Sequence, residues 1–164
     1  MLQQVAADAA GTPLAAEAAW AWLQAREMQP AQRIAATRKF LADFPKSPRA
    51  FAAHCRLAGL IEAERGVPGR DALTHWLQAW RAASDLAGRR TAGSQVASSI
   101  GETTDGELLA WLADRLGELP ADWRLDVPPG ELVAGARRRI AVVEGGKPAL
   151  AAVRAYQAAG GKLI

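Results

Sequence analysis

The sequence has few of the residues that build disulfides, metal clusters or β-sheets. Cys55 is the only cysteine, so neither an intrachain disulfide nor a cysteine-based zinc cluster can form. Aromatic residues make up 6% of the 164 residues, and six of these ten are tryptophan. β-Branched residues are sparse and no long run alternates apolar with polar residues, which argues against a sheet. We therefore expect an all-α protein.

Apolar segments of the kind found in signal peptides and membrane spans are also missing from the sequence. No positively charged segment followed by an apolar one opens the chain. No run approaches the roughly 20 apolar residues that cross a bilayer. A single cysteine fits a reducing compartment. We therefore expect a cytoplasmic protein without a membrane span.

The sequence has a small excess of positive charge, which lies at its C-terminal end. The net charge is +3; the first 114 residues carry twelve basic and twelve acidic side chains, and the last 50 carry eight and five. Nucleic-acid-binding proteins usually have a denser basic stripe. The most strongly basic segment is Arg137-Arg138-Arg139. On a helix the three side chains would be spread over about 200° around the axis, so they could not all face one surface. A solvated helix face is the ordinary interpretation, and nucleic-acid binding is the alternative.

Helix start and stop signals are frequent in the sequence. Thr12-Pro13 is typical of a helix start, Gly66 of a left-handed helix end, and Thr104 with Glu107 of a capping box. Gly145-Gly146 is expected to stop a helix. Together these signals predict seven helices, at about 12–28, 31–43, 48–65, 70–87, 104–118, 130–143 and 148–159.

The helices are expected to pair in sequence order, because their alanine-rich apolar surfaces are too wide for any one helix to cover alone. In the first helix we expect the inward stripe to be Leu14, Ala18, Trp22 and Ala25, widened by Ala19 and Leu23. We divide the chain into an N-terminal segment (1–11), helical hairpins (12–88), a loop or short helix (89–103) and C-terminal helices packed on the same array (104–164).

The region Leu14–Gly88 resembles tetratricopeptide repeats, which are helix–turn–helix units of about 34 residues that stack into a superhelix. The residues that carry the resemblance are Leu57-Ala58, Ile61, Gly66, Ala72, Trp76 and Ala79, together with Phe40 and the run Phe44-Pro45-Lys46-Ser47-Pro48. Departures are His54 where the family prefers tryptophan, Thr37 in place of a bulky residue, and a longer turn at Gly66–Gly69. The resemblance implies a short α-solenoid; a compact helical bundle is the alternative.

No residue is assigned a catalytic, cofactor-binding or metal-binding role. A Cys–His nucleophile pair needs facing side chains, and the adjacent residues His54 and Cys55 do not face each other on a helix. His75 could approach Cys55 only from the next helix. The acidic groups, such as Glu102, Asp105 and Glu107, lie at helix ends, where capping and solvation account for them. We interpret the thiol and the histidines as packed side chains.

The leading functional hypothesis is a non-enzymatic interaction module that binds a peptide or helix of a partner protein in a groove between helices. Candidate contact residues are Arg56, His75 and Trp80, followed by Trp123 and Arg124. Trp80 also lies four residues after Trp76, a spacing typical of the core. Nucleic-acid binding through Arg137–Arg139 is the first alternative. A helical enzyme, or an accessory subunit of one, with a pocket closed by Gly88–Gly101 is the second.

Overall fold

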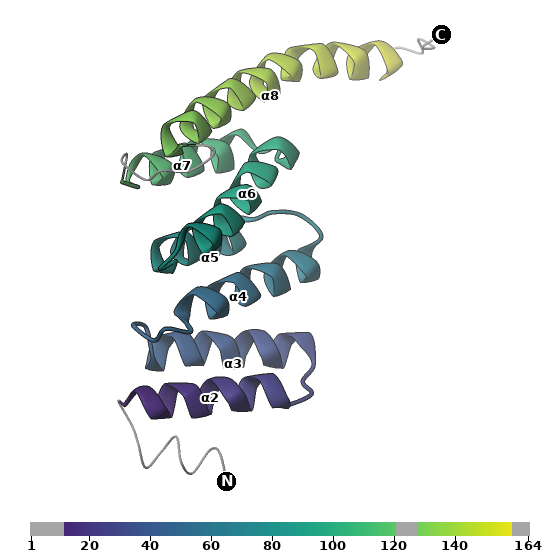
Figure 1. Ribbon diagram of the computed structural model, residues 1–164. Helices are drawn as coiled ribbons and strands as arrows, with labels where there is room; N and C mark the ends of the chain where they lie inside the picture. Colours follow the sequence, from purple (N-terminus) through teal and green to yellow (C-terminus); the bar gives the residue numbers. More distant parts are fainter. Residues whose placement is uncertain (1–11, 121–127, 159–164) are drawn as a thin grey trace. The chain divides into compact units, whose positions relative to one another are not determined.

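All described residues that are in regular structure are helical, which confirms the all-α prediction. The computed structural model (Figure 1) describes residues 12–120 and 128–158, the last eleven of these by backbone alone. These ranges hold seven helices and no strand: α2 (Pro13–Ala25), α3 (Pro30–Asp43), α4 (Ala50–Arg65), α5 (Arg70–Ala82), α6 (Leu86–Glu102), α7 (Gly106–Gly117) and α8 (Pro129–Ala158). None of these helices combines the length and apolarity needed to cross a membrane.

The chain divides into two compact units, and the boundary falls inside α6. Unit 1 extends to Val96, and unit 2 begins at Ala97. The N-terminal part of α6 therefore belongs to unit 1 and its C-terminal part to unit 2. We describe each unit by itself.

In unit 1 the helices pack in sequence order: α2 on α3, α3 on α4, and α4 on α5. The helix after Ser47 and the helix after Gly69 are thus neighbours, as the sequence predicts. One core cluster runs through these helices, with Leu23, Ile34, Phe40, Leu41, Ala50, Ala53, Leu57, Ile61 and Ala72 buried in it. Thr37 is also buried, and its hydroxyl donates to the carbonyl of Arg33 at 2.7 Å, so a polar residue is accommodated in an apolar layer.

The inward stripe predicted for α2 is only partly confirmed. Ala18 and Leu23 are buried as predicted, and Trp22 and Ala19 pack against the core. Leu14 is 63% exposed and Ala25 is exposed, whereas Ala15 and Ala16 are buried instead. The buried face of α2 is therefore rich in alanine, with Leu23 joining the core cluster shared with α3. Small side chains allow neighbouring helices to approach closely.

Two of the predicted helix ends are confirmed, and one cap is corrected. Thr12 accepts a hydrogen bond from the backbone N–H of Ala15 at 3.3 Å, and Gly66 ends α4 with φ +73°. At α7 the cap is Asp105, not Thr104. The Asp105 carboxylate accepts from the N–H groups of Glu107 and Leu108 at 2.9 and 3.0 Å. A carboxylate stabilises a helix N-terminus through both hydrogen bonds and charge.

The segment 89–103 was expected to be a loop or short helix, but all of it except Thr103 lies within a helix of 17 residues, α6. The preceding helix correspondingly ends at Ala82 rather than near 87, because Ala83 is extended (φ −68°, ψ 120°). Gly93 explains why a glycine-rich segment is stable here. A Cβ at that position would lie 3.3 Å from the Trp80 ring, so glycine lets α6 pack closely against it. Packing of this kind outweighs the low helix propensity of glycine.

The predicted stop at Gly145-Gly146 is also wrong, since α8 continues without a break from Pro129 to Ala158. Among the residues that the structure describes, only Gly66 has a positive φ, so neither glycine adopts the left-handed conformation of a helix end. The total of seven helices agrees with the prediction only because the gain of α6 offsets the merging of the last two predicted helices.

Unit 2 is built mainly on the pairing of α7 with α8. The apolar face of α7 buries Leu108, Leu109, Leu112 and Leu116, and α8 contributes Leu132 and Ala136. This pairing places the first part of α8, together with the end of α6, around the groove described below.

Candidate functional site

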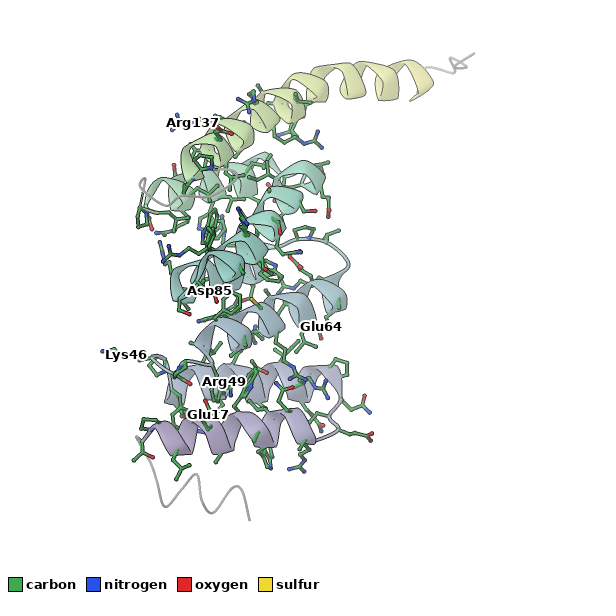
Figure 2. All side chains as sticks on the ribbon, in the orientation of Figure 1. Glu17, Lys46, Arg49, Glu64, Asp85 and Arg137 are labelled. Carbon is green, nitrogen blue, oxygen red and sulfur yellow. The ribbon has the colours of Figure 1, made fainter. Side chains whose placement is uncertain are left out.

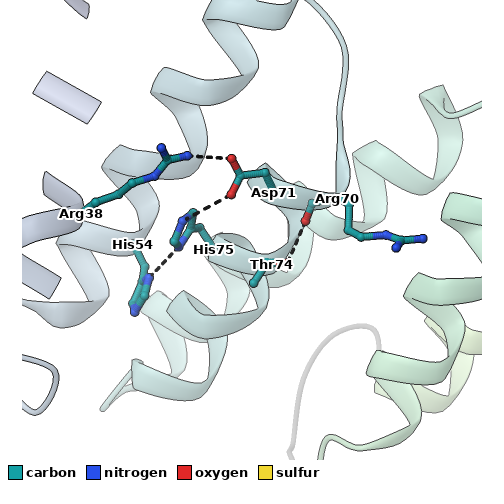
Figure 3. A network of polar contacts seen from close by, with 6 residues as sticks. All are labelled: Arg38, His54, Arg70, Asp71, Thr74 and His75. Atoms are coloured by element: carbon teal, nitrogen blue, oxygen red, sulfur yellow. Dashed lines mark hydrogen bonds and ion pairs between the residues drawn. The ribbon is translucent and has the colours of Figure 1, made fainter. Parts of the chain in front are cut away.

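The two histidines of the chain form a direct contact between α4 and α5 (Figure 3). Nδ1 of His54 lies 3.1 Å from Nδ1 of His75, and the two rings stack at a centroid distance of 5.3 Å and an angle of 29°. A hydrogen bond between these atoms requires a proton on one nitrogen and a lone pair on the other. The pair therefore holds one bridging proton and excludes a second one.

The histidine pair continues into an ion pair that connects α5 with α3 (Figure 3). Nε2 of His75 lies 3.8 Å from Oδ1 of Asp71, and the other carboxylate oxygen accepts from the Arg38 guanidinium at 2.7 Å. Four side chains from three successive helices thus form one polar network, His54–His75–Asp71–Arg38. Long-range pairs of this kind fix the relative rotation of neighbouring helices.

Burial decides the protonation state of the histidine pair. It lowers the pKa of His54 to about 4, with the charge of His75 acting in the same direction. Burial also lowers the pKa of His75; the Asp71 carboxylate opposes this shift and Arg38 reinforces it. Both imidazoles are therefore neutral at pH 7, which is the state that their mutual hydrogen bond needs.

The geometry gives Cys55 no role as a nucleophile. Burial raises the pKa of its thiol to about 11, so the reactive thiolate is scarce at neutral pH. The polar contacts of His75 are to His54 and Asp71. The sequence interpretation of a packed thiol fits these observations.

The network is not arranged as a metal site. The Nδ1 atoms of its two imidazoles contact each other, and the Asp71 carboxylate is paired with Arg38. In the part of the chain with described side chains, no group of three or more His, Cys, Asp or Glu residues is arranged to hold a metal ion.

The predicted contact residues are spread over different environments. Arg56 and His75 are partly exposed, on α4 and α5. Trp80 is 0% exposed and belongs to the core, so its ring is not accessible to a partner. It lies one helical turn after Trp76, and both rings face inward. Trp123 and Arg124 fall outside the described residues.

The structure separates the arginines of the basic triplet. Arg137 and Arg138 are exposed; Arg137 is labelled in Figure 2. Arg139 is partly buried and its Nε donates to the backbone carbonyl of Thr103 at 3.3 Å. The three charges therefore do not act as one surface.

A groove in unit 2 is the feature that the sequence interpretation missed. It measures about 520 Å³ and lies between the C-terminal end of α6 and the first turns of α8. Its lining is Ala97, Ile100, Gly101, Glu131, Leu132, Ala134, Gly135 and Arg138. The small residues of α8 could have indicated it, because Glu131, Ala134, Gly135 and Arg138 recur at helical spacing on one face. Helix α6, which forms the other side of the groove, was not predicted at this length. The sequence therefore provided no reason to expect a groove along this face of α8.

Comparison with known proteins identifies no relative: no protein-family model, curated protein or solved structure matches this chain.

Proposed function

We propose that this protein is an interaction module that binds a helix or extended segment of a partner protein in the groove of unit 2. The observation that carries the proposal is the groove itself, an apolar hollow of about 520 Å³ between α6 and α8. Pockets of this size hold a few large side chains, and amphipathic segments commonly bind by placing their apolar face in such a groove.

The chemistry of the lining defines the segment that fits. Ile100 and Leu132 are largely buried apolar residues of the lining, whereas Ala134 and Gly135 contribute small residues to it. Glu131 and Arg138 lie seven residues apart on α8, which is two helical turns and about 10 Å along the axis. A partner segment with a large apolar residue between a basic and an acidic one would match both charges.

The resemblance of Leu14–Gly88 to tetratricopeptide repeats supports the same class of function, since proteins of that kind bind other proteins through surfaces between stacked helices. Nucleic-acid binding by Arg137–Arg139 has less support, because Arg139 is engaged with Thr103. A helical enzyme has less support still, because the histidine network contains no activated nucleophile and His54 titrates far below neutral pH.

The proposal is tested by filling the groove. Gly135→Leu adds a side chain at a residue that lines the groove, and a Cβ there has room, because its nearest neighbour is a guanidinium nitrogen of Arg138, 4.0 Å away. Gly145→Leu is the matched control: the same substitution in the same helix, at an exposed position where a Cβ meets nothing within 4 Å. Peptides selected from a displayed library on the wild-type protein serve as ligands.

We expect the selected peptides to bind Gly145→Leu like wild type and to lose about tenfold or more in affinity for Gly135→Leu, since even one apolar anchor contributes well over 1 kcal/mol. Equal affinity for all three proteins, measured by titration calorimetry, would refute the groove as the binding site. Failure of the selection to enrich any peptide would count against the proposal as well.

A further inference from the structure

Three arginines on successive helices of unit 1 meet around the place where α2 ends and α3 begins. Arg26 is the C-cap of α2 and its guanidinium lies over the Trp22 ring, 5.1 Å from the centroid. Arg33, in α3, donates from its guanidinium to the backbone carbonyl of Arg26 at 3.4 Å. Arg56, in α4, is close enough to Arg33 for the two charges to repel each other. Arg33 thus connects the other two, through the backbone carbonyl of Arg26 and through its charge effect on Arg56, and we name the three residues the arginine cluster.

The arginine cluster has no acidic partner among the described residues, in contrast with other arginines of unit 1. Arg49 forms a bidentate pair with Glu17 at 2.8 and 2.9 Å (Figure 2), and Arg38 pairs with Asp71. On α4 itself, Glu62 accepts a hydrogen bond from Trp76 Nε1 at 3.0 Å. These three acidic side chains thus contact groups outside the arginine cluster.

Two members of the arginine cluster are partly buried, which makes the missing anion costly. Nε of Arg33 is buried and has no hydrogen-bond acceptor. Burial lowers the pKa of Arg56, and the neighbouring charge of Arg33 lowers it further. Desolvated like charges destabilise each other, so an anion that binds between them gains more than it would at an exposed arginine.

We propose that the arginine cluster binds carboxylate side chains of an acidic segment in a partner protein. A guanidinium presents parallel N–H groups that match a carboxylate, and charge-assisted pairs of this geometry are stronger than neutral hydrogen bonds. The apolar side chains of unit 1 that remain partly exposed include Trp22, under the guanidinium of Arg26, and Met28 in the adjoining turn. They favour a segment in which acidic and apolar residues alternate.

A protein ligand fits the arginine cluster better than a nucleic acid does. Nucleic-acid binding needs charges repeated along a strand or groove, and the region up to residue 114 has no excess of positive charge. The three arginines can bind acidic residues of a short peptide, and the tryptophan ring beside them can bind its apolar residues. The site uses residues of unit 1 alone and does not depend on the groove of unit 2.

The test uses a short fluorescein-labelled peptide of glutamates interspersed with leucine and phenylalanine, and a second peptide in which glutamine replaces every glutamate. Fluorescence anisotropy measures binding to the full chain and to Arg56→Gln and Arg33→Gln. Arg65→Gln is the control, because it removes the same charge from an exposed position on the same helix as Arg56. Circular dichroism checks that each variant is folded.

We expect each of the two cluster variants to weaken binding of the glutamate peptide by about tenfold, and the control to stay within about twofold of wild type. The glutamine peptide should bind all four proteins equally weakly. If Arg65→Gln lost as much affinity for the glutamate peptide as the two cluster variants, the attraction would be non-specific and the proposal would be overturned. It would also be overturned by binding of the two peptides with the same affinity, absence of any binding to wild type, or stronger competition by inorganic phosphate or single-stranded DNA than by the unlabelled glutamate peptide.

Discussion

The two units of this protein hold their helices together in different ways. In unit 1, several side-chain contacts cross between helices: Arg49 to Glu17, Arg38 to Asp71, His54 to His75 and Trp76 to Glu62. In unit 2, the leucines of α7 pack on α8, one arginine of α8, Arg139, donates to the carbonyl of Thr103, and the ion pairs Arg115–Glu118 and Lys147–Glu144 join residues only three positions apart.

The difference shows what each kind of packing permits. Directional contacts fix how one helix is rotated against the next, and they place charged groups such as the arginine cluster at defined positions. Apolar packing fixes the distance between helices but tolerates small residues on a face, and such residues leave room for the groove between α6 and α8. The two proposed binding sites follow from this contrast.

The largest expected effect comes from the cores. Trp80→Ala should destabilise unit 1 by about 3–5 kcal/mol, and Leu109→Ala should destabilise unit 2 by about 2–5 kcal/mol, because both side chains are fully buried and truncation leaves a cavity. Urea unfolding followed by circular dichroism measures both. Leu14→Ala, at an exposed position of α2, is the control and should change stability by no more than about 0.5 kcal/mol. If Trp80→Ala hardly changed the free energy of unfolding, the placement of that ring in the core would be contradicted.

The second expected effect concerns pH and should be confined to unit 1, which holds both histidines. The folded-state pKa of His54 is about 4, below the ordinary value of 6.5, so between these values the unfolded chain binds more protons than the folded one. Stability is therefore fully present above about pH 6.5 and is lost as the pH falls towards about 4. His75, whose pKa is also lowered, contributes with the same sign.

The variant His54→Asn/His75→Asn isolates this contribution. Its stability should fall less than that of wild type between neutral and mildly acidic pH, as measured by urea unfolding at each pH. Asp71 and Arg38, which face His75 in the wild type, are unchanged in the variant, so they are common to both curves. Parallel curves for the variant and the wild type would contradict the shifted histidine pKa values.

The smallest expected effect comes from replacing one glycine by alanine in each unit. Gly145→Ala in α8 should stabilise the protein by about 0.5–1 kcal/mol, because this glycine is exposed, in open space and inside a helix. Gly66→Ala at the end of α4 should destabilise it by about 1 kcal/mol, because φ is +73° there. Thermal unfolding should therefore give shifts of opposite sign. A destabilising Gly145→Ala would mean that α8 is interrupted at this glycine pair.

Much of the helix pattern was predictable because its signals are local. The caps at Thr12 and Gly66 depend on residues within one turn, and the pairing of α4 with α5 follows from two adjacent apolar helices joined by a short turn. Errors arose where a distant side chain decides the outcome. The stability of α6 depends on the Trp80 ring packing over Gly93, and no signal near Gly93 in the sequence reports that contact.

The candidate sites were less predictable than the helices. Arg56 and His75 were predicted from the sequence as candidate contact residues, but their neighbours Arg33 and His54 depend on how the helices are rotated against each other. Trp80 was placed in two roles at once, as a core residue and as a contact residue. Its burial decides between them.

The sequence by itself determined that this chain is helical, where most of its helices begin, and that neighbouring helices in the first half must share their apolar faces, because these properties depend on residues a few positions apart. The tertiary structure decided the two features on which binding is proposed. The arginine cluster and the groove each join side chains from different helices, and the distance between such side chains is set by packing, which no local pattern encodes.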